Sequence, residues 1–256
     1  MMSRDAAGRV GPCCGLLLLM MMLACRGGDV VAGTPPTERA PEPPTPSALA
    51  LKPVSVNQVC ATLGKPLPSA SGLFLVEDPK LRATLAGSRG HGIELAFRYL
   101  GPTALDAKLR SGRERRQLGI ELLVRDTCNL LYVMWRVEPR SELVVSVKRN
   151  GAQSTHAACE NRGYYRLLPA VVSPVPELVP GAEHRLRAEV AEGALSVHVD
   201  GAVVWSGRLD TPALELSGNS GLRSDNARFD VLALSADVPS APAACDESGP
   251  ARIGAD

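Results

Sequence analysis

Alternation of apolar and polar residues is the main pattern of the chain beyond residue 92. Ile93, Leu95, Phe97 and Tyr99 are separated by polar residues or alanine, and a period of two is the pattern of a strand with one buried face. Residues 118–124 and 130–137 are more continuously apolar, as in strands covered on both faces. Further strands are predicted over residues 143–147, 164–168 and 229–234.

The clearest strand pair lies between residues 184 and 199. Apolar residues alternate on both sides of Glu192-Gly193, and pairing across this turn sets Leu186 opposite Val199. One apolar face results, so the register is self-consistent. Asp200-Gly201 follows as a two-residue hairpin signal that leads into a strand over residues 202–205.

A turn-rich composition supports the same fold class. The chain has 21 prolines and 24 glycines but only 4% aromatic residues, which indicates many turns and short elements. No sustained helical periodicity is found after residue 50. We therefore predict an all-β domain, a two-sheet antiparallel sandwich over residues 51–245, followed by a disordered tail at residues 246–256.

Two segments resemble the concanavalin A-like and laminin G-like sandwiches. The central hairpin of those folds is similar to residues 195–207, LSVHVDGAVVWSG, and their closing segment is similar to residues 218–230, GNSGLRSDNARFD. The resemblance implies a concanavalin A-like jelly roll. Because that superfamily includes lectins, glycan hydrolases and adhesion modules, the resemblance implies no single activity.

The first 25 residues resemble the signal peptide of a bacterial lipoprotein. Arg4 and Arg9 give a positive start, and residues 16–24 form an apolar run that is too short to span a bilayer. The run ends at Cys25, as in the lipobox, in which the cysteine is diacylated and becomes the mature N-terminus. Met22 stands where the lipobox most often has leucine. The alternative is an ordinary signal peptide cleaved near Val31-Ala32, which would discard Cys25.

Residues 25–50 follow the leader as a proline-rich tether. They include PEPPTP at residues 41–46 and have too little apolar surface to offset the entropy of ordering. Proline keeps such a segment extended, at about 3.1 Å per residue where the polyproline conformation persists. We expect residues 1–24 to be removed, and the exported protein to be held in the bacterial cell envelope by a lipid on Cys25. The membrane is then a partner of the protein through that lipid.

The cysteines indicate two disulfides in an oxidising compartment. Of the 7 cysteines, two lie in the leader and Cys25 would carry the lipid. The four that remain allow three connectivities, and no spacing between them fits a zinc site. We favour a Cys128–Cys159 bond, which brackets a hairpin, and a Cys60–Cys245 bond, which ties the ends of the domain together.

Catalytic and nucleic-acid functions have little support in the sequence. A net charge of +1 gives no global field to attract nucleic acid. A retaining glycan hydrolase needs two carboxyls about 5 Å apart, yet Glu94, Glu121 and Glu189 each stand alone. We predict a non-catalytic envelope or surface lipoprotein that binds a glycan or a protein partner. The alternatives are a glycan hydrolase with an unrecognised acid pair and a purely structural envelope lipoprotein.

Ligand contacts are expected from a basic cluster and from one tryptophan. Arg113, Arg115 and Arg116 would contact an anionic glycan or lipid headgroups, unless they form a solvated hairpin loop. Trp205 faces away from the core if the preceding hairpin is a strict two-residue turn, and it would then stack on a sugar ring. A bulge would instead place Trp205 in the core, where we also expect Trp135.

Calcium is the one cofactor for which the sequence offers candidate ligands. Asp225 and Asn226 could supply oxygen ligands at the rim of the sandwich, as the resemblance to laminin G-like domains implies. An Asp-Asn pair is also what a turn requires. The four histidines are scattered. We therefore expect no metal and no other cofactor.

Overall fold

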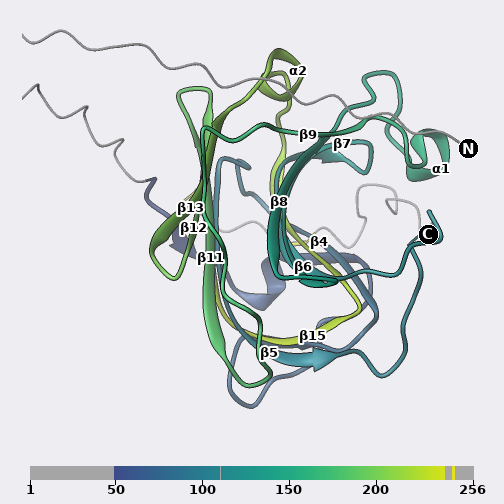
Figure 1. Cartoon of the computed structure of the whole chain (residues 1–256), viewed down its shortest axis with the longest axis vertical. Helices are drawn as coiled ribbons and strands as arrows, with labels where there is room; N and C mark the ends of the chain where they lie inside the picture. The colour runs from purple at the N-terminus through teal and green to yellow at the C-terminus, as the bar shows by residue number, and fades with distance from the viewer. Residues whose placement is uncertain (1–48, 110, 240–243, 246–256) are drawn as a thin grey trace, which may run out of the picture. The chain divides into compact units, whose positions relative to one another are not determined.

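The computed structural model describes residues 49–109, 111–239 and 244–245, which form a sandwich of two antiparallel β-sheets (Figure 1). The predicted fold class is confirmed. Residues 1–48 and 246–256, which hold the predicted leader, Cys25 and the predicted tail, lie outside the described residues. Helical turns in the described part are short, and none is long and apolar enough to cross a membrane. They are η1 (Val56–Gln58), α1 (His156–Cys159) and α2 (Thr211–Leu214).

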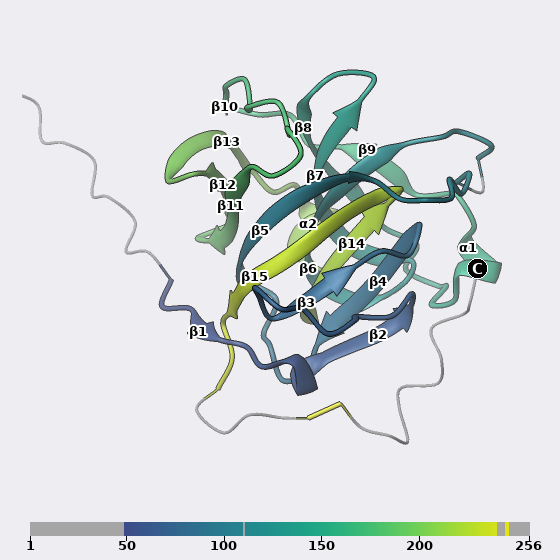
Figure 2. The same cartoon turned by 90° about the horizontal axis from the view of Figure 1, so that it is seen from below.

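Sheet A has eight strands, with neighbours in the order β1-β15-β5-β11-β12-β13-β10 and with β3 paired to β15. Figure 2 shows β15 lying between β5 and β3. The bounds are β1 (Lys52–Pro53), β3 (Phe74–Val76), β5 (Gly92–Pro102), β10 (Val171–Val172), β11 (Glu183–Ala191), β12 (Ala194–Val199), β13 (Ala202–Arg208) and β15 (Ala227–Ala236).

Sheet B has seven strands in the order β2-β4-β14-β6-β7-β8-β9. Strand β14, which is late in the chain, lies between β4 and β6, so residues far apart in sequence become neighbours on this sheet. The bounds are β2 (Val59–Leu63), β4 (Lys80–Leu85), β6 (Arg116–Asp126), β7 (Asn129–Glu138), β8 (Glu142–Lys148), β9 (Tyr164–Arg166) and β14 (Asn219–Asp225).

The apolar core lies between the inner faces of the two sheets. Alternate residues of each strand enter it, as the period of two requires. Phe97 of sheet A contacts Trp135 of sheet B edge-on, with ring centroids 5.9 Å apart, and it contacts Phe229 at 6.2 Å. Trp135 is 0% exposed, so its predicted place in the core is confirmed.

The predicted register of the β11–β12 hairpin is confirmed. Leu186 pairs with Val199, and Ala188 pairs with Val197. The next turn is the expected two-residue hairpin, because Asp200 and Gly201 both have positive φ angles, 51° and 85°. Alternation therefore specified the β11–β12 register, and turn chemistry specified the turn that follows it.

Trp205 lies in the core, and the register that would expose it is wrong. The turn before β13 has two residues, but the pairing shifts between Val197 and His198. His198 pairs with Val203 and Val197 pairs with Trp205, so Val204 is the extra residue of a bulge. The shift turns Trp205 to the core face, where it is 3% exposed. Trp205 is therefore no exposed platform for a sugar ring.

Both favoured disulfides are present. Cys128 is bonded to Cys159 with Cα atoms 5.9 Å apart, and Cys60 is bonded to Cys245 with Cα atoms 5.5 Å apart. The second bond joins β2 to the segment beyond β15 and so links the two ends of the domain, as expected. The first bond fastens α1 to the β6–β7 turn, which is the end of sheet B that matters for the site described next.

Candidate ligand groove on sheet B

The outer face of sheet B, which is turned away from sheet A, is hollowed into a groove of about 560 Å³. All seven strands of the sheet contribute side chains to it, so the groove crosses the sheet from β2 to β9. Two loops add walls, one before β6, which contributes Leu109, Ser111, Arg113 and Arg115, and one at residues 156–161, which include α1. A concave site of this size is typical of small-molecule or saccharide binding.

Strand alternation divides β7 between the core and the groove. Trp135 points into the core, whereas Leu130, Tyr132 and Met134 belong to a separate apolar cluster and line the groove. On the neighbouring strand β6, Glu121 pairs with Tyr132 and lines the groove as well. The floor of the groove therefore combines an apolar patch with polar side chains at its edge.

Asp225 forms the centre of a buried polar network beneath the groove. Its Oδ1 accepts a hydrogen bond of 2.7 Å from Arg82, and its Oδ2 accepts from Gln117 at 2.6 Å and from Arg223 at 3.2 Å. Burial alone would raise the pKa of this carboxyl, but the charges of Arg223 and Arg82 outweigh it and hold the pKa well below its usual range. Asp225 is therefore ionised, with both oxygens engaged by the protein.

Neither residue named for calcium is available as a metal ligand. The carboxylate of Asp225 is bonded to its three neighbours, and the described residues contain no cluster of three or more His, Cys, Asp and Glu that could hold a metal ion. The Asn226 side-chain oxygen accepts from Ala107 N at 2.7 Å. Its amide nitrogen donates to the carbonyls of Ala107 and Arg115 at 3.0 and 2.9 Å. Asn226 thus holds the loop that carries Arg113 and Arg115 against the sheet.

A tyrosine pair with two cations lies next to this network. The rings of Tyr132 and Tyr164 are stacked with centroids 5.8 Å apart, and their hydroxyls are 3.4 Å apart. The Arg223 guanidinium lies 4.9 Å from the Tyr132 ring, and Lys148 Nζ lies 5.0 Å from the Tyr164 ring. Burial raises the pKa of the Tyr164 phenol, but Arg223 and Lys148 outweigh this effect and lower the pKa below its usual value.

Glu121 is a buried carboxyl in the groove with an unusual pKa. Desolvation raises this pKa from 4.5 to about 7, against the opposing charges of Arg223 and Arg82 and with a contribution from Asp225. Desolvation disfavours the charged form of an acid, and here it outweighs the two arginines. Glu121 is therefore largely neutral in mildly acidic solution and ionises around neutral pH.

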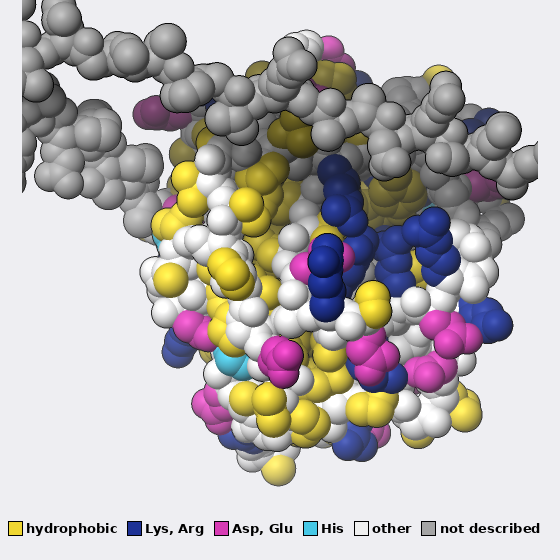
Figure 3. Space-filling view, in the orientation of Figure 1, with side chains coloured by type: hydrophobic (Ala, Val, Ile, Leu, Met, Phe, Trp, Pro, Cys, Tyr) yellow, Lys and Arg dark blue, Asp and Glu magenta, His cyan; other side chains and the backbone are white. Residues whose placement is uncertain are grey.

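Positive side chains dominate the lining of the groove. Of the described residues that line it, seven are Lys or Arg and two are acidic, Glu121 and Asp126. Figure 3 shows Lys and Arg side chains gathered beside a hollow on the face drawn there. The seven cations are Lys80, Arg82, Arg113, Arg115, Arg136, Arg166 and Arg223.

The predicted basic cluster is divided by the structure. Arg113 and Arg115 line the groove, whereas Arg116 begins β6 and pairs with Glu138 at the start of the neighbouring turn. Arg110, which precedes these three arginines in the sequence, lies outside the described residues. The loop thus brings two of the three named arginines, Arg113 and Arg115, to the groove, and strand pairing turns the third away from it.

Arg115 lies in a field of like charges. Burial lowers the pKa of its guanidinium, and the positive charges of Arg136, Arg113 and Arg223 lower it further, against the opposing charge of Asp225. Arg136 donates from Nη1 to Glu142 at 2.6 Å, but its Nε is buried and has no hydrogen-bond partner among the described residues. This end of the groove therefore holds positive charge that the described residues do not balance.

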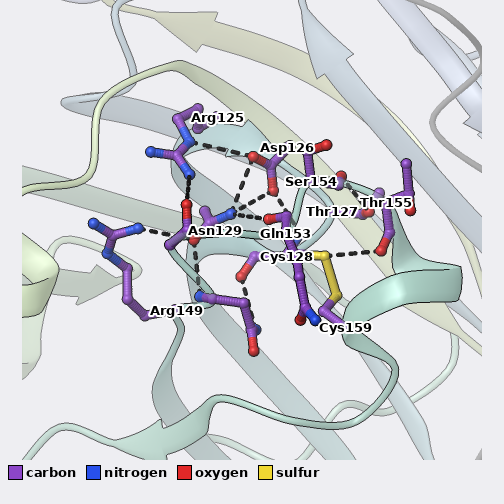
Figure 4. A network of polar contacts seen from close by, with 12 residues as sticks. Arg125, Asp126, Thr127, Cys128, Asn129, Arg149, Gln153, Ser154, Thr155 and Cys159 are labelled. Carbon is purple, nitrogen blue, oxygen red and sulfur yellow. Dashed lines mark hydrogen bonds and ion pairs between the residues drawn. A yellow bond between two sulfur atoms is a disulfide. The ribbon is translucent and has the colours of Figure 1, made fainter.

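A cross-linked loop closes the other end of the groove. Figure 4 shows Asp126 accepting hydrogen bonds from Cys128 N and Asn129, while Asn129 also donates to the Gln153 carbonyl at 2.8 Å. The Cys128–Cys159 disulfide fastens the same loop at α1. This support fixes the segment at residues 156–161 that lines the groove.

Several groove residues carry no signal that the sequence interpretation used. The sequence predicts strands that include Tyr132 and Tyr164, and no sequence pattern marks Arg223 or Gln117 as site residues. One usable signal exists, because Arg223 and Asp225 are two apart on a strand and therefore share a face. Their partners Arg82 and Gln117 come from distant segments, and only the strand order of sheet B brings the four together.

No protein-family model matches the sequence, and no curated protein is significantly similar to it. Among solved structures, the chain is similar to the carbohydrate-binding module CBM66 from Bacillus subtilis, with 11% identity and a TM-score of 0.48 over 70% of this chain and 95% of that one. It is similar to apo Crh5 transglycosylase, with 14% identity and a TM-score of 0.46 over 75% and 82% of the two chains. It is also similar to galectin LEC-6 of Caenorhabditis elegans, with 14% identity and a TM-score of 0.36 over 72% of this chain and 97% of that one. Similarity at this level assigns no ligand to the chain.

Proposed function

We propose that the protein is a non-catalytic, lipid-anchored protein of the bacterial envelope that binds a glycan chain in the groove of sheet B. The observation that supports this most directly is the composition of the groove floor. Leu130 and Met134 form a nearly buried apolar cluster, the side chain of Tyr164 lines the groove and is 41% exposed, and Gln117, Ser146 and Thr84 add polar groups. A sugar ring has an apolar face and a rim of hydroxyls, so it would match such a surface.

The rigidity of the floor supports binding of an extended ligand. Strand pairing fixes the backbone across all seven strands, and the disulfide of Cys128 with Cys159 fastens the loop at one end. A preformed site loses little conformational entropy when it binds, which favours affinity.

Glycan hydrolysis is the second candidate function, and the hydrogen bonds of Asp225 argue against it. The pKa values of Glu121 and Asp225 are displaced in opposite directions, as in acid–base pairs. Asp225, however, is 0% exposed. Its Oδ1 accepts a hydrogen bond from Arg82, and its Oδ2 accepts hydrogen bonds from Arg223 and Gln117. A nucleophile or base needs an oxygen that reaches the substrate or its attacking water, so we favour a structural role for Asp225.

Lipid anchoring is part of the same proposal. The apolar run that ends at Cys25 and the proline-rich tether that follows it support a lipid on this cysteine. Metabolic labelling with a palmitate analogue tests it: label should enter the wild-type chain and be absent from Cys25→Ala. An unlabelled mature protein that begins at or after Gly33 would contradict the anchoring.

A glycan panel with a groove-blocking variant tests the binding function. Ser146 of β8 lines the groove, so Ser146→Trp in the full chain should abolish binding to any glycan that the wild type retains. Ser196 is the matched control, because it is a half-buried serine on β12 of sheet A, and Ser196→Trp should leave binding unchanged. Equal binding by both variants, or no wild-type binding to any panel glycan, would contradict the proposal.

A further inference from the structure

The described residues neutralise the positive charges of the groove only in part. Arg82 and Arg223 share one carboxylate, that of Asp225, and Arg136 is paired with Glu142. Among the described residues, neither Arg113 nor Arg115 has an ion-pair partner. Counted over the described residues, the groove therefore has a surplus of positive charge, and this surplus is largest where residues 113–115 approach the sheet.

The strand register brings three of these arginines to the same end of the groove. Gln117 pairs with Arg136 on one side and with Asp225 on the other, so Arg136 and the Asp225–Arg223 network flank the start of β6. Arg115 immediately precedes that strand, and its carbonyl is fixed by Asn226 at 2.9 Å. Backbone pairing and one side-chain clamp thus hold Arg115, Arg136 and Arg223 on rigid supports.

We propose that the ligand is an anionic glycan whose carboxylate or sulfate groups bind to Arg115, Arg136 and Arg223. This inference rests on the proposed glycan-binding function. Arginine binds such groups through paired N–H donors in a fixed planar geometry. The buried Nε of Arg136, which has no partner among the described residues, is one donor that a small shift would present to an anion. Repulsion among the arginines also favours an anion between them, since a bound negative charge would relieve it.

The surroundings of the arginines favour a sugar polyanion over an acidic protein or a nucleic acid. The same groove contains the nearly buried apolar cluster of Leu130 and Met134 and the exposed side chain of Tyr164, which give a sugar ring apolar groups to pack against. The positive charge is confined to a groove of about 560 Å³, and the chain as a whole has a net charge of only +1. A duplex nucleic acid needs an extended basic surface, and a glycan chain needs only the groove.

Matched pairs of polysaccharides separate charge from sugar recognition. Binding of the full chain would be measured for polygalacturonate against its methyl ester, and for dextran sulfate against dextran, with polyglutamate as a polyanion without sugar. We expect the charged member of at least one pair to bind about tenfold or more tighter than its neutral partner at 0.15 M salt, and the preference to shrink as salt increases. The pair that shows the preference identifies a carboxylate or a sulfate as the recognised group.

Arg115→Gln tests the proposed contact without disturbing the buried network. Arg115 is half-buried and donates no side-chain hydrogen bond to a described residue, so the variant should melt close to the wild type. It should lose about tenfold in affinity for the charged glycan and little for the neutral one, as expected for a lost charge-assisted contact. Arg185→Gln, on β11 of sheet A, is the control; it removes an arginine that pairs with Glu94 away from the groove and should change neither affinity.

The outcomes distinguish this inference from the function on which it rests. One outcome is equal affinity for both members of every pair, with Ser146→Trp still abolishing binding. It would overturn the proposal that the ligand is anionic and would leave the proposal of glycan binding in the groove intact. Polyglutamate binding as tightly as either charged glycan would overturn both, in favour of an acidic peptide. Loss of the charge preference in Arg115→Gln, with retention in Arg185→Gln, would support the inference.

Discussion

The guanidinium of Arg223 lies 4.9 Å from the centre of the Tyr132 ring, although strand β6 separates the strands that carry the two residues. Arg223 pairs in register with Gly119 of β6. Because glycine has no side chain, the guanidinium can extend across β6 toward β7. A cation over an aromatic face is attracted by it, so this contact helps to hold Arg223 in the floor of the groove.

Gly119 should therefore be sensitive to substitution. A Cβ at this position would collide with the carbonyl oxygen of Val133 and lie 2.9 Å from the Met134 Cα. We expect Gly119→Ala to destabilise the protein by about 1–3 kcal/mol in a urea titration, and to weaken glycan binding by displacing Arg223. The control is Gly151→Ala, whose Cβ meets only the Arg149 side chain at 3.4 Å or more. Equal stability of the two variants would contradict the account of Gly119.

Trp205 should contribute to stability and not to binding. Its ring is in the core of the sandwich, and removing a buried aromatic ring leaves a cavity. Trp205→Ala should cost about 3–5 kcal/mol in unfolding free energy, with glycan affinity of the folded fraction unchanged. Val203→Ala, at a 45% exposed neighbour on the same strand, should change stability by less than about 0.5 kcal/mol. A Trp205→Ala variant that keeps its stability and loses binding would reverse this assignment.

The Cys128–Cys159 disulfide should stabilise both the domain and the end of the groove. The bond closes a loop with a sequence separation of 31, for which the chain-entropy estimate gives about 3.5 kcal/mol. A Cys128→Ser, Cys159→Ser double variant should lose that stability and show faster hydrogen exchange over residues 149–162. Peptide mapping of the purified protein without reductant provides the direct check. Free thiols at both positions would be incompatible with this role.

Ionisation of Glu121 should make stability depend on pH. The pKa of Glu121 in the folded protein, about 7, lies above the ordinary value of 4.5. The folded state therefore holds this proton more tightly, so the contribution of Glu121 is fully present below pH 4.5 and is lost as pH rises through 7. The loss amounts to about 3 kcal/mol. Glu121→Gln should remove this pH dependence, which urea titrations between pH 4.5 and 8 would measure.

The same ionisation should weaken the binding of an anionic glycan. Glu121 faces Arg223, Arg82, Asp225 and Tyr132, and its negative charge would oppose an anion bound to the arginines. Affinity should fall as pH rises through about 7 in the wild type, and it should fall less in Glu121→Gln. Glu177→Gln, an exposed carboxylate in the loop before β11, is the control and should follow the wild type. An affinity that is flat across this range in all three proteins would contradict the role of Glu121.

Local patterns predicted the sheets better than they predicted the groove. The β11–β12 register followed from alternation on either side of Glu192-Gly193, because each residue on one strand constrains its partner on the next. The bulge at Val204 did not follow, since residues 202–205 are continuously apolar or small and either register buries an apolar side chain. The position of Trp205 therefore depended on a backbone irregularity that the pattern does not encode.

The groove depends on strand order, which a single sequence encodes weakly. Its central network joins Arg82, Gln117, Tyr132 and Arg223, which come from four strands of sheet B. Sequence spacing places residues of one strand on one face, as with Arg223 and Asp225, but it does not show which strands are neighbours. The disulfides could be predicted because four remaining cysteines allow only a few pairings. The polar side chains of the sheet allow far too many possible hydrogen-bond pairings for the same reasoning.

The location of a bound glycan tests the central claim most directly. A crystal structure of the full chain with the tightest-binding glycan of the panel would show which surface the sugar occupies. The account predicts sugar rings over Leu130 and Met134 in the groove of sheet B, with an anionic group within hydrogen-bond distance of Arg115 or Arg223. A glycan bound on sheet A, or on loops away from the groove, would contradict it.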